Sequence, residues 1–167
     1  MYLETDKIIV REFISSDVVE LKRFLSSGYV AKWMPGWFDG GDSVDEWFVE
    51  IINDYSDNNQ ENKFGCYAVV KKSSGIFMGC AECMMNDGDI IGITICMNPD
   101  YIDCGHLTDA YKVLIDYLLR TQSGKAIEII SQAENIIESK AVEKLGLLLT
   151  KANQIEEVKT FNHYLIT

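Results

Sequence analysis

Glu82 is the one charged residue in the apolar run 76–85, and its carboxylate could act there as a base. An acid in the middle of a strand-like apolar run is costly unless it is paired or exposed. A carboxylate in this position could take a proton from an attacking amine, directly or through water. The alternative is an outward-facing acid on an antiparallel strand that has one face in water.

Gly105 lies at the junction of a predicted strand and a predicted helix, an arrangement that can hold an anion. The apolar run 90–97 ends at Asn98-Pro99, a loop follows over 101–104, and after Gly105 apolar residues recur at helical spacing. A helix start has unpaired N–H groups and about half a positive charge, so a phosphate can bind there. Gly105 would let the ligand approach the backbone closely. The alternative is a loop that joins strand and helix and binds nothing.

The five cysteines favour neither a metal site nor a nucleophile. Cys80 and Cys83 have the spacing CAEC, but no second Cys or His pair follows at the distance of a zinc site. Cys104 has no His–acid pair placed in the sequence to activate it. An odd number of cysteines in apolar runs is typical of reduced thiols in a cytoplasmic protein.

The elements that must position these residues follow from periodicity and turn signals. The order is strand, two helices, three strands, helix, strand, helix, two strands. Helices are expected after Ser15-Ser16-Asp17, after Asp42 or Ser43, after Gly105 and over 139–145, and Gly28 is expected to end the first. The turns KSSG and NDGD make the second, third and fourth strands antiparallel neighbours. The expected strands are 8–13, 64–71, 76–85, 90–97, 126–131, 147–151 and 158–166.

Length and charge narrow the function classes. A chain of 167 residues suits one domain, 1–167, with a sizeable core. The net charge of −11 disfavours nucleic acid and suits a cationic substrate, although an acidic surface also serves solubility. No apolar run approaches the ~20 residues of a membrane span, and no signal peptide precedes Tyr2. We therefore expect a cytoplasmic protein with no membrane partner.

Three segments match a known pattern in order along the chain. The opening, YLETDKIIVREFISSDVVEL, is similar to LETDRLxLRxxxxxD. The middle, NPDYIDCGHLTDAYKVLIDYLL, is similar to NPxYWGKGYATEALxxLIxYAF, and ENIIESKAVEKLGL is similar to ENxxSxxVLEKLGF. With these segments and its order of elements, the chain resembles the GCN5-related N-acetyltransferase (GNAT) superfamily. The branch it resembles is that of the ribosomal-protein N-acetyltransferases, which also includes spermidine acetyltransferase relatives.

The resemblance implies an α/β (α+β) fold with a mixed, V-splayed central sheet of about seven strands and helices on both faces. Strands 90–97 and 126–131 would part to admit the pantetheine arm of acetyl-CoA, the cosubstrate, and no metal is implied. The backbone of Cys96 and Met97 would pair with the pantetheine amides, and Asn135 would hydrogen-bond the arm. The pyrophosphate would be held by backbone N–H groups, which suit a diphosphate whatever their side chains. The residues concerned are Asp103, Cys104, Gly105, His106 and Leu107.

The chain also departs from that pattern. Ile102-Asp103-Cys104-Gly105 stands where the family has Trp-Gly-Lys-Gly, so a lysine is lost and an acid gained beside the diphosphate. A like-charge contact at ~4 Å costs on the order of a few kcal/mol, so Asp103 must point away or affinity suffers. Glu138 replaces a serine that can help to protonate the leaving thiolate, and the tyrosine of other branches would fall at Val142. Glu138 could itself be a protonated acid near the thiolate, or a charge that stabilises a helix start.

The expected function is transfer of an acetyl group from acetyl-CoA to a primary amine by direct attack, with Glu82 and Glu138 as catalytic candidates. Positioning and a strand N–H that polarises the thioester carbonyl would supply most of the catalysis. A weakened or non-catalytic CoA-binding module of the same fold is the alternative, and transfer of a larger acyl group is a third. The sequence leaves open the acceptor, which could be a peptide N-terminus, a polyamine or another small-molecule amine. It also leaves open the oligomeric state, a homodimer included.

Overall fold

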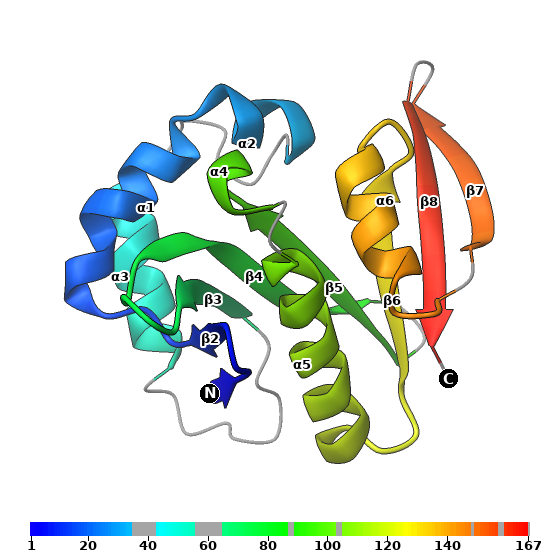
Figure 1. Ribbon diagram of the computed structural model, residues 1–167, viewed down its shortest axis with the longest axis horizontal. Coiled ribbons are helices and arrows are strands. Elements are labelled where there is room, and N and C mark those ends of the chain that lie inside the picture. Colours follow the sequence, from blue (N-terminus) through cyan, green and yellow to red (C-terminus); the bar gives the residue numbers. More distant parts are fainter. Residues whose placement is uncertain are drawn as a thin grey trace.

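The computed structural model describes residues 1–34, 43–55, 65–86, 89–102, 105–147, 149–156 and 159–166; of β7 and the start of β8 it describes the backbone alone. At its centre is an eight-stranded mixed sheet in the order β1-β2-β3-β4-β5-β6-β8-β7 (Figure 1). Neighbouring strands are antiparallel except β5 and β6, which are parallel. The strands are β1 (Tyr2–Glu4), β2 (Ile8–Arg11), β3 (Gly65–Lys71), β4 (Phe77–Asn86), β5 (Ile90–Met97), β6 (Ala126–Gln132), β7 (Leu149–Glu156) and β8 (Lys159–Ile166).

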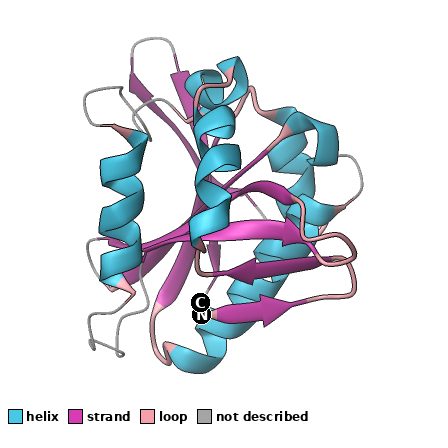
Figure 2. Cartoon of the chain, turned by 90° about the vertical axis from the view of Figure 1, so that its left-hand side faces the viewer, coloured by secondary structure: helices cyan, strands magenta, loops and turns pink. Residues whose placement is uncertain are grey.

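Helices cover both faces of the sheet, so the predicted fold class is confirmed (Figure 2). One face of the sheet packs against α1, α2 and α3, and the other face packs against α5 and α6. Each face has its own cluster of buried apolar side chains. Strand residues alternate between these clusters, as the pleat of a strand requires. In β4, for example, Cys80 faces the α1–α3 cluster and Ala81 the α5 cluster. The helices are α1 (Val18–Leu25), α2 (Gly28–Trp33), α3 (Val44–Asp54), α4 (Pro99–Ile102), α5 (His106–Thr121) and α6 (Ile136–Glu143), with a 3-10 turn at Ser15–Asp17.

The long helix α5 buries one stripe of side chains, which is why it lies flat on the sheet. Its buried residues recur three or four positions apart, the spacing at which helical side chains share a face. Figure 1 shows α5 lying across the strands, with α4 just before its start. The buried residues are His106, Leu107, Ala110, Tyr111, Leu114, Ile115 and Leu118.

Capping decides where several helices begin, and it corrects two expected boundaries. Gly28 does not end the first helix: α1 stops at Leu25, and the Ser27 hydroxyl accepts the Val30 N–H and starts α2. The last helix begins at Ile136 rather than at residue 139, because the side chain of Asn135 caps it. Of the two candidates for the start of α3, Ser43 is the cap, in a reciprocal pair with Glu46.

Two further differences concern strand number and the expected loop 101–104. The sheet gains an eighth strand at its edge because β1 folds back on β2 in an antiparallel pair. Part of the expected loop is helical: α4 ends at Ile102, and the Asn98 side chain accepts the N–H of Asp100 at 3.0 Å, which favours the turn. Asp103, Cys104 and Phe64, the last at the expected start of the second strand, lie outside the described residues.

Candidate active site

Strands β5 and β6 part halfway along their length. They pair in parallel only from Ile90 to Ile93 and from Ala126 to Ile129, although β5 continues to Met97 and β6 to Gln132. We call residues 90–93 and 126–129 the closed end, and residues 94–97 and 130–132 the open end. Figure 1 shows β5 leaning away from β6 toward α4. The sheet is therefore splayed between the two strands that the sequence predicted to part, and we call the region between β5 and β6 the wedge.

Backbone groups of β5 face the open end. Asn98 donates its N–H to Met78 of β4 at 2.7 Å, so the even-numbered residues of β5 bond to β4 and the odd-numbered ones point toward β6. Past Ile93 the partner strand has departed, and Ile95 and Met97 are left facing the gap. Of the two residues predicted to pair with pantetheine, Met97 faces the gap, whereas the amide of Cys96 belongs to the β4 ladder.

A buried carboxyl group lies at the open end. Glu138 is 6% exposed, and its side chain accepts the Tyr111 hydroxyl at 2.5 Å and the Asn135 amide at 3.0 Å. Burial raises the pKa of Glu138 to about 7, although the hydrogen bonds from Tyr111 and Asn135 favour the charged form and oppose the rise. The backbone N–H of Ile95 interacts with the Tyr111 oxygen and opposes the rise in the tyrosine pKa that burial causes. The cluster thus links α5, α6 and the first backbone donor that β5 presents to the gap.

Two other polar side chains are buried at the end of β6. The Ser131 hydroxyl is buried and has no hydrogen-bond partner among the described residues. Gln132 donates its side-chain amide to the carbonyl of Trp33 at 3.0 Å, which ties the end of β6 to α2 across the gap. A buried polar atom without a partner costs free energy, so a ligand that paired with Ser131 would remove a penalty.

Lys7, a cation that the sequence analysis did not assign to the site, lies at the start of α5. Gly105 has a φ of 78° and opens the helix. A Cβ built on it would lie 3.4 Å from the Lys7 ammonium, which is also 3.6 Å from Asp109. The N–H groups of His106 and Leu107 belong to the first turn, which has no carbonyl partners within the helix. The His106 ring is buried against the carbonyl of Tyr101 at 2.9 Å, so it is not the surface ring that its position in a loop would suggest.

Two adjoining hollows extend from this helix start between α5 and α6. The first, about 200 Å3, is lined by Gly105, Ile137, Lys140 and Lys144 among others. Lys140 and Lys144 are four residues apart, so both lie on one side of α6.

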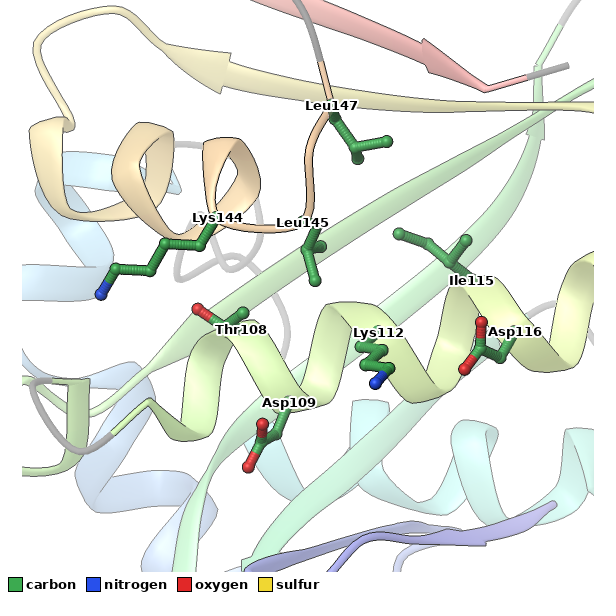
Figure 3. A pocket seen from close by; sticks show the side chains of 8 residues that line it. All are labelled: Thr108, Asp109, Lys112, Ile115, Asp116, Lys144, Leu145 and Leu147. Atoms are coloured by element: carbon green, nitrogen blue, oxygen red, sulfur yellow. The ribbon is translucent and has the colours of Figure 1, made fainter.

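The second hollow, about 460 Å3, shares Thr108 and Lys144 with the first. Figure 3 shows Ile115, Leu145 and Leu147 between α5 and the segment that follows α6. Asp109, Lys112 and Asp116 give its wall mixed charge. The space between α5 and α6 thus offers hollows that are lined by apolar side chains and lysines.

Glu82 lies on the other face of the sheet. It is half-buried on β4, directly opposite Cys66 of β3 and Thr94 of β5. That face belongs to the α1–α3 side, whereas Tyr111 and the helix that carries Glu138 pack on the α5 side. The two catalytic candidates are therefore not neighbours, and they approach β5 from opposite faces.

The same face continues across β6 and β8 as a polar strip. Glu128 accepts a hydrogen bond or ion pair from His163 at 2.8 Å, and Asn86 reaches its other oxygen at 3.5 Å. The Asn86 side chain crosses over β5 at Gly92, where a Cβ would lie 2.8 Å from the amide nitrogen. Gly92 is thus the residue that allows the contact between β4 and β6.

Within the described ranges, no group of three or more His, Cys, Asp or Glu side chains is placed to hold a metal ion. No helix in the part of the chain that the structure describes is both long and apolar enough to cross a bilayer.

Comparison with known proteins shows which family and which solved structures this chain is similar to. Residues 7–148 match the family model described as acetyltransferase (GNAT) domain. No curated protein sequence matches the chain. Among solved structures, a GNAT-family acetyltransferase from Bacillus anthracis is 19% identical with a TM-score of 0.79, covering 99% of this chain and 98% of the other. The ribosomal-protein-S5-alanine acetyltransferase of Vibrio fischeri is 16% identical with a TM-score of 0.81, covering 99% and 96%. Spermidine N-acetyltransferase of Vibrio cholerae, in complex with CoA and spermine, is 15% identical with a TM-score of 0.76, covering 97% and 96%.

Proposed function

The chain belongs to the acetyltransferase (GNAT) domain family, and on that premise we propose that it transfers the acetyl group of acetyl-CoA to a primary amine. Family membership supports N-acetyltransferase activity in general. The finer proposal concerns where the cosubstrate and the amine bind and which residues act on them.

The observation that carries the proposal is the open end of the wedge. Met97 presents backbone groups to a gap that none of the described strands fills, so an extended amide-containing ligand could pair there as an added strand would. The buried Ser131 hydroxyl, which has no partner among the described residues, offers a further polar contact. Both features fit the pantetheine arm, which is narrow and carries two amides.

The phosphates of CoA would lie at the start of α5. First-turn N–H groups of Gly105, His106 and Leu107 supply donors, and the helix adds about half a positive charge. Lys7, Lys140 and Lys144 supply the cations that the departure from the family pattern removed from the loop. Asp103 and Cys104 belong to the same predicted set and lie outside the described residues.

Asn135 has a supporting role in this proposal. Its amide group donates to Glu138 and its carbonyl accepts the N–H of Glu138 at 3.4 Å, so both ends are engaged within α6. A direct bond from Asn135 to the cosubstrate would need one of these contacts to open.

The amine would approach from the α1–α3 face, where Glu82 stands beside Thr94. An amine is mostly ammonium at neutral pH and must lose a proton before it attacks, so a carboxylate here would serve as a base, directly or through water. The net charge of −11 and the acids Glu82 and Glu128 on this face suit a cationic acceptor. A polyamine and a peptide N-terminus both meet that description, and the same charge disfavours a nucleic-acid partner.

A second function, a CoA-binding module without turnover, is favoured by one observation. The Tyr111 oxygen interacts with the N–H of Ile95, which is the donor that a thioester carbonyl in the gap would meet. A side chain that stayed on this donor would compete with the carbonyl for it.

Mass spectrometry of the products distinguishes the two functions. The protein would be incubated with acetyl-CoA and either spermine or a peptide with a free N-terminal alanine, and the acceptor would be examined for one added acetyl group. Glu82→Gln should lower the rate at least tenfold, because positioned bases contribute ~10²- to 10⁴-fold, while acetyl-CoA binding stays intact. Binding of acetyl-CoA without any acetylated amine would favour the module.

A further inference from the structure

Two residues that differ from the quoted family pattern are in contact with each other. The pattern has leucine at the position of Tyr111 and serine at the position of Glu138. Both side chains are buried, and they form a hydrogen bond of 2.5 Å between α5 and α6. The two departures therefore act as one unit rather than as separate changes.

The Tyr111–Glu138 pair extends to the gap between β5 and β6, where the thioester would react. Its last member is Tyr111, whose oxygen interacts with the N–H of Ile95, and Ile95 is the first residue past the closed end whose backbone faces the gap. A thioester drawn along β5 toward the closed end would thus bring its carbonyl and sulfur to the Tyr111 hydroxyl.

The state of Glu138 decides what this hydroxyl can do. When Glu138 is a carboxylate, the Tyr111 O–H donates to it and is not available to a ligand. When Glu138 is protonated, its own O–H can donate to the Tyr111 oxygen, and the tyrosine proton is released for another acceptor.

Tyrosine alone would be a poor acid in this place. Burial, followed by the nearby Glu138, raises the pKa of Tyr111 well above its ordinary value. A buried phenol can give up its proton only if a second proton replaces it at the same time, and Glu138 is placed to provide that proton.

We propose that the Tyr111 hydroxyl donates a proton to the sulfur that leaves during acetyl transfer, and that Glu138 is the positioning residue that keeps it ready to donate. This inference rests on the proposed function. As the tetrahedral intermediate collapses, the carbon–sulfur bond breaks with its electron pair on sulfur, and the sulfur takes the tyrosine proton. The tyrosine oxygen takes the proton of the Glu138 carboxyl, and the carboxylate regains a proton from water. The proton that the amine loses leaves on the opposite face, through Glu82 or water.

The pair makes the reaction sensitive to pH on the alkaline side. The ionisable groups that interact electrostatically with Glu138 are Tyr111 of α5, Tyr29 of α2 and Cys96 of β5. Burial raises the pKa of each of these three groups, so none is charged near neutral pH. Glu138 is then the group of this cluster that titrates near neutrality, and deprotonating it would remove the donor.

The first test compares Tyr111→Phe with Tyr117→Phe, the same change on the same helix away from the pair. With spermine as the amine probe, or the alanine peptide if spermine is not acetylated, Tyr111→Phe should lower kcat by ~10²-fold, the lower range for a positioned acid. Its KM for acetyl-CoA should change less than twofold, and Tyr117→Phe should keep the wild-type rate. A Tyr111→Phe protein that binds acetyl-CoA and keeps its full rate would overturn the inference.

The second test holds even if Tyr111→Phe fails to fold. In Glu138→Gln the side chain neither titrates nor gives up a proton, so this variant should be slower than the wild type at pH 6. Because only the wild type loses its donor as the pH rises, the rate of the variant divided by the wild-type rate should rise at least tenfold between pH 6 and pH 9. A ratio that does not change with pH would overturn the role of Glu138. Lack of any acetyl transfer by the wild type would overturn the proposed function itself, a result distinct from wild-type transfer with no effect of either substitution.

Discussion

The closed and open ends of the β5–β6 wedge belong to the same two strands, but different kinds of buried side chain surround them. At the closed end, Ile91, Ile93, Ile127 and Ile129 are all at most 1% exposed and fill the core under α5. At the open end, the buried set includes a hydroxyl, an amide, a carboxyl and a phenol. On the α5 side, apolar residues pack where the strands pair, and polar residues join apolar ones such as Ile95 and Met97 where they part.

The difference shows that the groups whose burial costs free energy lie at the open end. Burying a polar group costs free energy unless every hydrogen bond is made, so such groups gather where a site needs them. The closed end should therefore tolerate no loss of volume, whereas changes at the open end should affect ligands and pH dependence more than folding.

The largest effect should come from the closed end. Ile129→Ala should lower the free energy of unfolding by ~2 to 5 kcal/mol, because it removes a fully buried side chain and leaves a cavity. Ile76→Ala, at a position that is 46% exposed, should change stability by less than about 0.5 kcal/mol. Urea unfolding of the two variants measures this, and equal losses would mean that the closed end is not the anchor of the wedge.

Glu138→Gln should change how stability depends on pH. The folded-state pKa of Glu138 is raised from 4.5 to about 7, so its contribution is fully present below pH 4.5 and is lost as the pH rises through 7. The rise corresponds to about 3 kcal/mol. Wild type should therefore lose stability relative to Glu138→Gln between pH 5 and pH 8, as measured by urea unfolding at both values. Parallel curves would show that Glu138 titrates normally.

Lys140→Glu should weaken acetyl-CoA binding by about tenfold at low salt, because it reverses a charge in the hollow beside Gly105. Added salt should reduce the difference, since exposed charges are screened. Lys22→Glu makes the same charge change on α1, outside that hollow, and should bind as the wild type does. Calorimetric titration at two salt concentrations measures the affinities. Similar affinities for the two variants would show that the phosphates do not bind in this hollow.

The smallest effect should be that of Ser131→Ala. Stability should stay the same or rise by up to about 1 kcal/mol, because the hydroxyl removed has no partner among the described residues. Acetyl-CoA affinity should fall by about two- to tenfold, the equivalent of one hydrogen bond. A loss of stability with unchanged affinity would mean that Ser131 serves the fold.

Much of this arrangement was predictable from the sequence. Period-two and period-3.6 patterns predicted most of the strands and α5. The resemblance to a family predicted that β5 and β6 part. The boundaries that were wrong depended on capping, since Gly28 reads as a helix end until Ser27 is seen to start a new helix.

The site was harder to predict because its residues have ordinary roles in the sequence. Tyr111 has the spacing of a core residue, and only its contact with Glu138 sets it apart. From the sequence, Glu138 could be an acid near the thiolate or, the interpretation we favoured, a charge at a helix start, and in the fold it is a buried residue in the first turn of α6. The lysines near the start of α5 were not predicted either. Lys140 and Lys144, four residues apart in a predicted helix, were nevertheless a signal for one basic face.

The melting temperature in the presence of acetyl-CoA tests the central claim most directly. A ligand at 100 times its dissociation constant that binds only the folded state adds about 2.7 kcal/mol of stability. For a chain of this size, that corresponds to a rise of roughly 5 to 10 °C. The account predicts such a rise for acetyl-CoA and a smaller one in Lys140→Glu at the same ligand concentration. No shift at millimolar acetyl-CoA would contradict the claim that the wedge is a cosubstrate site.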